Sequence, residues 1–517
     1  MLFRSDLLVK GLEGVSTTLP GLLRLMQGPA NLLRKGVTRM PVYALRQAIR
    51  DPWHAMIAGG VDGAPILNSM KELKSMLRNE NAVEKALQEQ GLLISQVFGP
   101  SEKANISILR DFVAGTTHWT AAMSKLDHFA IKGDASARVA AYNSFIKQGM
   151  SPMEASLAQL DMMNFTKRGI SPSVNALSMM IPFFNAQIVG LSTLVKAMRG
   201  TTLFADRVNV QEKLIKRGAM MAGLALLYTA LASDTDAYKN AKPIERLMNV
   251  FVPVPGTNDM MRVPIPFEVG YIFKALPEAI LNVASGDEKL RDILPAIKQM
   301  AISTIPGGSN LMLPQAVKPA IEAITNYNAF TGEHVVQGRA AHMEAPYQAY
   351  RGTSEFSKIL GGMLGVSPIK IDHLIRGYTG SVGAAIVSLA NPPLATQERV
   401  VQGPADMPII GSMFQREDNG RWVDMAYNRI DEAIKAQTTY KQLLETDPDK
   451  AAKYLEDKVD VLANSSIAGR ARQQLGDIAK SMRAIYVADI PKAEKKALLR
   501  ELNKLRTEYS KVLVSAF

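Results

Sequence analysis

Apolar residues recur at helical spacing through most of the chain. Between residues 153 and 164 they lie three or four positions apart, which places them on one face of a helix. The face consists of Met153, Leu157 and Leu160, with the polar Asn164 at the next position of the same spacing. Ser151 and Pro152 precede it as a helix cap and a first-turn proline, and Glu154 follows the cap by three positions. We therefore predict a helix that begins near Pro152. The stretch SARVAAYNSFIKQG predicts another amphipathic helix before it, closed by Gly149.

The last hundred or so residues are highly charged and strongly periodic. Three apolar stripes run through them: Ala452, Leu455, Val459 and Leu462; Ile467, Ala471, Leu475, Ile478, Met482 and Ile485; and Leu498, Leu502, Leu505, Tyr509 and Val512. Alternating steps of three and four are typical of the narrow seam along which helices pack on helices, within a chain or between chains. Each stripe covers only two or three heptads, which favours a bundle over a long coiled coil.

Two segments have the pattern of β-hairpins. FVPVPGTNDMMRVPIPF alternates Val and Pro around a Gly-Thr-Asn-Asp turn, and its prolines restrict it to the edge of a sheet or to a lid. In SMFQREDNGRWVDM, Asn419 and Gly420 stand between alternating residues, which is a strong short-range hairpin signal.

Three uncharged runs raise the question of a membrane. GAMMAGLALLYTALA, from Gly218 to Ala232, would rise only ~22 Å as a helix, whereas a bilayer core needs about 20 apolar residues. The run 169–195 is long enough to cross, but its Asn175 and Gln187 need hydrogen-bond partners in hydrocarbon. The third run, 378–397, is broken by two prolines. Protein-buried helices are therefore favoured over stable transmembrane spans.

These patterns together predict a mostly α protein, a multi-helix bundle with one or two small β-hairpin insertions. We expect four regions along the chain. They are an N-terminal helical region (1–120), a helical core with two uncharged runs (121–245), a helical region with the Pro-rich hairpin and Gly-rich loops (246–410), and a charged C-terminal helical bundle (411–517).

Composition narrows the function classes. The chain of 517 residues has no cysteine, which excludes disulfides, Cys-ligated zinc and a thiol nucleophile. Its net charge of +12 favours partners that carry negative charge, either nucleic acid or an anionic lipid surface. The 27 methionines suit surfaces that repack against more than one neighbour.

Motifs that carry chemistry are absent from the sequence. The histidines form no ligand pair at helical spacing, and no P-loop, GxGxxG after a strand, or G-x-S-x-G elbow occurs. No catalytic residue, metal site or cofactor is therefore expected. Basic residues do cluster near the C-terminus, where Arg500, Lys504 and Lys511 share one helical face. They are candidate contacts for DNA phosphates or lipid headgroups, although the default for such a face is a solvated outer surface balanced by Glu494, Glu501 and Glu508.

Several segments together resemble the large polyvalent protein-associated domain family of phages. The resemblance lies in GMSPMEASLAQLDMMNFTKRG with IPFFNAQIVG, then VPIPFEVGYIFKALPE, NYNAFTGEHVV, GTSEFSKILGGMLGVSPIKIDHLIRGYTG and DIPKAEKKALLRELNKLRTEYSKVL, in that order. It runs from roughly Ala121 to the C-terminus, and RMPVYALRQAIRDPWHA is similar to a segment that precedes the domain.

The resemblance implies an internal virion (ejection) protein of a short-tailed phage. Such a protein would be packaged inside the capsid, leave ahead of the genome, and oligomerise in the host envelope into a helical conduit for DNA. The implied partners are further copies of itself, other ejection proteins, portal or tail proteins, double-stranded DNA bound without sequence preference, and the host inner or outer membrane. Enzymatic modules that accompany many relatives have no counterpart in the motifs of this chain, so we expect no enzymatic activity.

Two alternatives stay open at the level of sequence. A peptidoglycan-degrading entry enzyme, or an accessory to one, could use buried carboxylates that meet only in the fold. A membrane-embedded phage protein could use the uncharged runs as spans.

Overall fold

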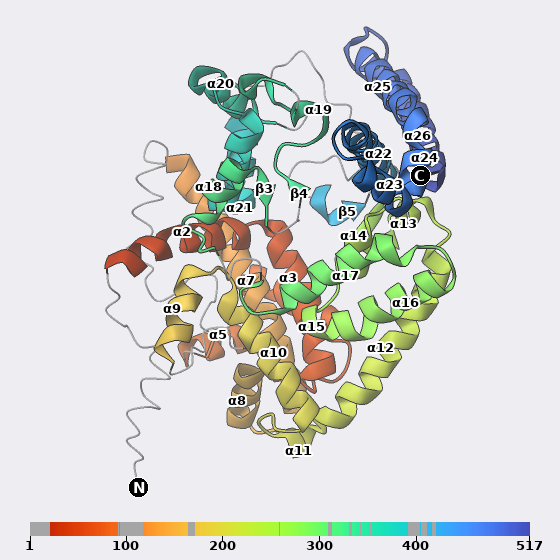
Figure 1. Cartoon of the computed structure of the whole chain (residues 1–517). Helices are drawn as coiled ribbons and strands as arrows, with labels where there is room; N and C mark the ends of the chain where they lie inside the picture. Colours follow the sequence, from red (N-terminus) through yellow and green to blue (C-terminus); the bar gives the residue numbers. More distant parts are fainter. Residues whose placement is uncertain are drawn as a thin grey trace. The chain divides into compact units, whose positions relative to one another are not determined.

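A computed structural model describes residues 21–90, 92–93, 117–163, 171–257, 259–308, 313–329, 333–341, 343–350, 353–390, 404, 411–415 and 420–516. The chain forms two compact units. The first comprises residues 1–231, 247–250 and 263–391, and the second comprises 232–246, 251–262 and 392–517. Helices dominate both units (Figure 1), so the predicted mostly α fold is confirmed.

The first unit begins with a run of helices. These are α2 (Gly21–Thr38), α3 (Pro41–Ala58), α4 (Pro65–Leu77), α5 (Ala82–Glu89), α7 (Thr117–Lys147), α8 (Pro152–Met163), α9 (Pro172–Met180), α10 (Phe184–Arg199), α11 (Ala205–Val208) and α12 (Val210–Ala232). Its later part holds α15 (Phe267–Gly270), the π-helix η1 (Tyr271–Ala275), α16 (Leu276–Ala284), α17 (Leu290–Thr304), α18 (Lys318–Thr325), α19 (Gly338–Ala341), the 3-10 helix η3 (Ala345–Tyr347), α20 (Glu355–Leu364) and α21 (Pro368–Ala390).

Small residues bring the central helices of this unit close together. Gly133 of α7 lies so near α3 that a Cβ atom there would stand 2.7 Å from the Cβ of Ala44. The main core cluster is rich in alanine, with Ala55, Ala137 and Ala141 packed around Phe145. A core of small side chains keeps helix axes close, but it leaves fewer inward positions for leucine, isoleucine and methionine.

The predicted start of α8 is confirmed in detail. Ser151 N–H donates to Glu154 Oε2 over 3.0 Å, and Glu154 N–H donates to Ser151 Oγ over 3.3 Å, a complete capping box. Gly149 closes α7 with a φ of +86°. The predicted inner face of α8 is wrong, however. Met153 and Leu157 are exposed, and the residues that are buried in their place are Ala155, Ser156, Ala158, Gln159 and Met162.

The uncharged run 169–195 does not form one helix. Among its described residues, α9 ends at Met180 and α10 begins at Phe184, and between them Phe183 has a φ of +62°. Gln187, one of its polar residues, has hydrogen-bond partners within the protein. Gln187 donates to Ser303 O over 3.1 Å and accepts from Gly307 N–H over 2.8 Å. The run therefore supplies two short helices rather than a span.

The Pro-rich hairpin is confirmed, and the second predicted hairpin is wrong. β1 (Asn249–Pro253) and β2 (Met260–Pro264) flank a turn in which Gly256 has a φ of +76°. The sheet order is β1-β2-β5, with β5 (Phe414–Gln415) antiparallel to β2. Residues from Arg421 onward form α22 instead of a return strand, because Val423, Ala426, Ile430 and Ala433 follow helical spacing over a much longer stretch. Asn419 lies outside the described residues.

A second small antiparallel pair was not predicted. It consists of β3 (Tyr327–Asn328) and β4 (Glu333–His334), and Tyr327 stands opposite His334. Strands of two residues are too short to produce a readable alternation.

The second unit contains α13 (Asp236–Lys239), most of α14 (Pro243–Met248), the 3-10 helix η5 (Gly411–Met413), α22 (Arg421–Thr446), α23 (Pro448–Asp457), α24 (Val459–Ala463), α25 (Ser465–Val487) and α26 (Lys492–Ala516). Helices α22, α25 and α26 pack on one another around Ile430, Leu475 and Leu513. The predicted helical bundle is thus present here.

Of the three predicted seams, only the one in α25 has its central residues, Ala471, Leu475 and Met482, buried. The predicted seams of α23–α24 and α26 are wrong. Leu455, Val459, Leu505 and Val512 are exposed, while Ala451 and the face Leu499, Asn503, Thr507, Ser510 and Val514 are buried. Polar side chains (Asn503, Thr507 and Ser510) lie between Leu499 and Val514 on this inner face, where the three helices pack around the alanines of α22 and α25.

Candidate interaction surface

Helix α12 is attached to the first unit at its N-terminal end. Lys213 Nζ donates to Asp62 Oδ2 over 2.9 Å and to Gly60 O over 3.1 Å, and Arg217 donates to Val61 O over 2.8 Å and also pairs with Asp62. Partial burial would raise the pKa of Asp62, but the hydrogen bonds from these two cations hold it below its usual range. The loop 59–64 thereby fixes the base of the helix.

Beyond that base, one narrow stripe of α12 faces inward. It consists of Leu214, Gly218, Met221, Ala225, Thr229 and Ala232. A Cβ atom at Gly218 would lie 2.5 Å from the Phe273 ring of η1, and the Lys274 ammonium lies 5.7 Å from the Tyr228 ring centroid. Helix α12 therefore lies against η1, and Figure 1 shows it along the outside of the unit.

The opposite side of α12 is apolar as well, and it is exposed to solvent. The exposed stripe consists of Met220, Leu224, Leu227 and Leu231, and Leu231 is 71% exposed. Their spacing of four, three and four is that of a helix–helix seam, and the segment 218–232 carries no charge. No described residue covers this face. Burying each such side chain against a partner would contribute about 1.5–3 kcal/mol.

The sequence identified the run 218–232 but not which of its faces stays exposed. The small residues Gly218, Ala225 and Ala232 repeat at intervals of seven, and this spacing is the signal that distinguishes the inner stripe from the leucine stripe. We name the side chains of Met220, Leu224, Leu227 and Leu231 the α12 outer face.

Exposed large apolar residues beside buried small residues also occur elsewhere in the chain. In α8 and in α26 several large apolar residues are exposed, while small or polar residues share the buried face with Met162 and Leu499. Near α12, the neighbouring η1 and α16 expose a further row at intervals of four, made of Ile272, Leu276 and Ile280. Helix α12 has a mean hydropathy of 1.3 over an 18-residue window, and only 28% of that window is buried. By length and composition it is the one helix among the described residues that could cross a membrane.

The predicted contacts for DNA or headgroups lie on α26. Arg500 and Lys504 are exposed, and Lys511 is half-buried with its Nζ 2.8 Å from Glu508 Oε1. Their spacing of four and seven residues keeps them on one side of the helix, away from the buried Leu499 and Ser510. Their role in binding stays a prediction.

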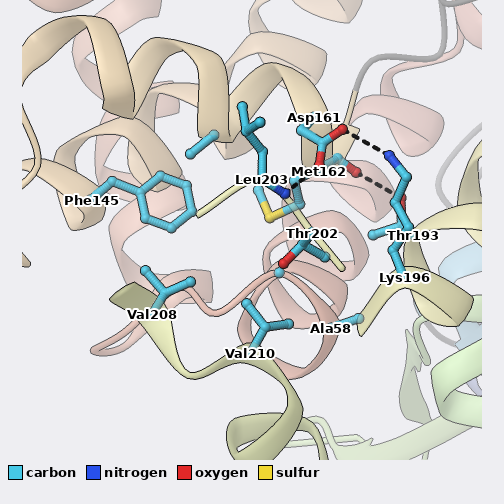
Figure 2. Close-up of a pocket in the computed structure, with 12 residues that line it drawn as sticks. Ala58, Phe145, Asp161, Met162, Thr193, Lys196, Thr202, Leu203, Val208 and Val210 are labelled. Carbon is cyan, nitrogen blue, oxygen red and sulfur yellow. Dashed lines mark hydrogen bonds and ion pairs between the residues drawn. The ribbon is translucent and has the colours of Figure 1, made fainter. Parts of the chain in front are cut away.

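A pocket in the first unit is lined mostly by apolar side chains and one ion pair (Figure 2). Its empty volume is about 340 Å³, part of it open to solvent. Lys196 Nζ lies 2.9 Å from Asp161 Oδ1, and the other oxygen of Asp161 accepts from Leu203 N–H over 3.1 Å. Both charged groups of the lining are thus occupied with structural contacts, and the lining offers no arrangement of nucleophile and base.

Buried carboxylates lie apart from this pocket. Burial raises the pKa of Asp51 and of Glu268, and neither residue lines the pocket. Others are paired, such as Glu84 with Lys132 and Glu278 with Lys274. Within the described part of the chain, no three His, Asp or Glu side chains come together to hold a metal ion. The exposed apolar faces are therefore the strongest candidate functional feature.

Comparison with known proteins locates one family within the chain. Residues 235–410 match the model of large polyvalent protein associated domain 38. No curated protein and no solved structure matches the chain. The matched residues include three of the segments that carried the resemblance, at 263–278, 326–336 and 352–380, whereas the flanking segments lie outside the match. Residues 235–410 thus support the family that the sequence resembles, over a shorter stretch than the resemblance covered.

Proposed function

We propose that this chain is an internal virion protein of a phage that assembles with copies of itself into a helical conduit for genome delivery across the host envelope. The α12 outer face carries the proposal. A lone chain leaves this face in water, whereas sister subunits could cover it with apolar surface of the same kind. The matched domain, whose family is associated with phages, supports the phage context.

The mechanism of such a conduit is physical rather than catalytic. Helices held by alanine-rich contacts can exchange neighbours without breaking disulfides, because the chain has no cysteine. Subunits would bury their exposed leucine faces against one another. Exposed cations such as Arg500 and Lys504 could then meet DNA through weak, sequence-independent contacts that allow the DNA to slide.

One observation favours lipid, rather than protein, as the surroundings of α12. Because α12 passes the length and hydropathy test for a span, a membrane-embedded protein is the second candidate function. However, the charge-free part of the helix is only ~22 Å long, and the basic residues at its base are bound to Asp62. These features favour protein neighbours along most of its length.

The proposal is tested by the mass of the particle. Purified protein in mild detergent should form oligomers, and the double variant Leu224→Gln/Leu227→Gln should associate at least tenfold more weakly. Folding should be unaffected, because both side chains are exposed. Leu67→Gln on α4, a site that is 72% exposed, is the matched control.

Two results would contradict the proposed function. The first is a chain that stays monomeric in every detergent and lipid tested. The second is a cleared zone on purified cell wall that disappears with one Glu substitution, which would establish the peptidoglycan-degrading alternative instead.

A further inference from the structure

The end of α20 presents apolar side chains that the proposed conduit does not use. From Ile359 to Ile369 the sequence ILGGMLGVSPI contains no charge. The exposed large side chains are Phe356, Ile359, Met363, Leu364 and Val366, and Met363 is 77% exposed. We name these five residues the α20 tip. They lie within the matched domain.

The tip is held rigidly against α21. A Cβ atom at Gly361 would lie 2.7 Å from Val366 O and 2.8 Å from Pro368 Cγ, so the chain turns tightly there. Gly365 ends the helix with a φ of +70°, and Val366 N–H donates to Gly361 O over 3.0 Å. Exposure of the tip therefore does not result from a frayed helix end.

The other end of α20 is clamped by one carboxylate. Asp372 of α21 accepts hydrogen bonds from Ser354 N–H (2.9 Å), Ser354 Oγ (2.6 Å) and Ser357 Oγ (2.7 Å). The two helices thus form a fixed hairpin that presents the tip as a unit.

The distribution of exposure identifies the kind of surface that fits the tip. All five consecutive residues from Gly362 to Val366 are exposed. Because successive helical residues are ~100° apart, Gly362, Met363 and Leu364 point to different sides of the helix end. A partner helix would cover only one face of α20, as we propose for α12. Lipid can surround an apolar helix end on every side, so it fits the exposure of the tip better.

The polar residues around the tip fit an anionic headgroup layer. Lys358 and Lys370 border the charge-free run, with Lys358 paired to Glu355. Two exposed tyrosines lie nearby: Tyr347 is the last residue of η3, and Tyr350 follows it. The helix η3 packs on α20. Tyrosine rings with a polar end are typical of the membrane–water interface. A helix of 10 residues is only ~15 Å long, so it can enter the interface but cannot cross the bilayer.

We propose that the α20 tip is a membrane-interface anchor, which inserts Met363, Leu364 and their neighbours at the boundary of headgroups and acyl chains in an anionic bilayer. The inference rests on the proposed function in one respect: the proposed function is what brings the protein to the bilayer of the host envelope. It does not require the α12 outer face to contact lipid.

A fluorescent probe at a single cysteine tests the proposal, since the chain has no cysteine of its own. An environment-sensitive dye on Leu364→Cys is compared with the same dye on Leu67→Cys of α4. Vesicles of phosphatidylethanolamine and phosphatidylglycerol should raise the emission of the dye at 364 at least twofold and shift it to the blue. Brominated lipids should quench that dye, and the dye at 67 should change little.

Substitutions separate lipid contact from protein contact. Met363→Glu/Leu364→Glu should lower partition into these vesicles at least tenfold and leave the mass of the oligomer unchanged. If the emission of the dye at 364 did not change when vesicles were added, the proposal would be overturned. A double variant that binds vesicles normally but no longer self-associates would also overturn it, because the tip would then face protein. Failure of the proposed conduit would show differently, as loss of the oligomer while the dye at 364 still responds to lipid.

Discussion

At the scale of single residues, small side chains decide which faces of the helices are buried. Gly133 allows α7 to approach Ala44 of α3, and Gly218 allows α12 to approach the Phe273 ring. Where a glycine or alanine lies inward, the adjacent leucine or methionine lies outward. The same property that brings the helices close thus generates the exposed apolar surface.

Gly133→Val should destabilise the first unit by about 1–3 kcal/mol, because the added atoms collide with the backbone of α3. Gly469→Ala on the exposed side of α25 should instead stabilise the second unit by about 0.5–1 kcal/mol, since nothing lies within 4 Å of the added Cβ. Urea unfolding of each variant measures both effects. If Gly133→Val did not lower the unfolding free energy, the contact between α7 and α3 would be looser than described.

His54 should make the first unit sensitive to acid. Burial, and then the charge of Arg50, lower the pKa of His54 to about 4 in the folded protein, whereas the unfolded chain takes up the proton near pH 6.5. The stabilisation is therefore complete above pH 6.5 and is lost as the pH falls from 6.5 to 4, by up to about 3 kcal/mol in total.

The comparison of wild type with His54→Gln isolates this contribution. Asp51, whose pKa is raised by burial, acts in the opposite direction in both proteins and cancels in the difference. Between pH 6.5 and 5 the wild type should lose about 2 kcal/mol more unfolding free energy than the variant. Parallel curves would mean that the imidazole is protonated within the fold.

At the scale of elements, helix boundaries could be predicted from the sequence because their signals are local. Ser151, Glu154 and Gly149 specify the start of α8 and the end of α7 through bonds within a few residues. Which face of a helix is buried depends on its neighbours, and there the predictions for α8, α23 and α26 were wrong. The rule that large apolar residues are buried assumes that a chain buries them all within itself. The rule fails where such residues stay exposed in the isolated chain.

The basic side of α26 gives a prediction for DNA binding. Arg500→Gln and Lys504→Gln should each weaken binding to double-stranded DNA about equally for all sequences, and each lost phosphate contact should reduce the salt slope by about 0.9. Lys511→Gln should have a smaller effect, because Lys511 is paired with Glu508. Titrations at several salt concentrations measure the slope, and an unchanged slope in all three variants would exclude these residues from phosphate contact.

At the scale of the whole molecule, fold class and family could be read from the sequence, whereas the interaction surfaces could not. Periodicity predicts helices wherever it occurs, and the quoted segments between 263 and 380 identify the family domain. The α12 outer face and the α20 tip became visible only once burial was known, because large apolar residues are exposed there while small residues such as Gly218, Ala225 and Gly361 are buried. The four predicted regions of the chain stay a prediction.

The central claim is that the exposed leucines of α12 face sister subunits, and a site-specific photo-crosslink tests it most directly. A benzophenone probe on Leu227→Cys in the otherwise cysteine-free chain reports any neighbour of the α12 outer face. Illumination of the assembled particle should produce crosslinked dimers of the chain, while the same probe on Leu67→Cys should produce few. Crosslinks to lipid or detergent alone, with no dimer above that control, would contradict the account.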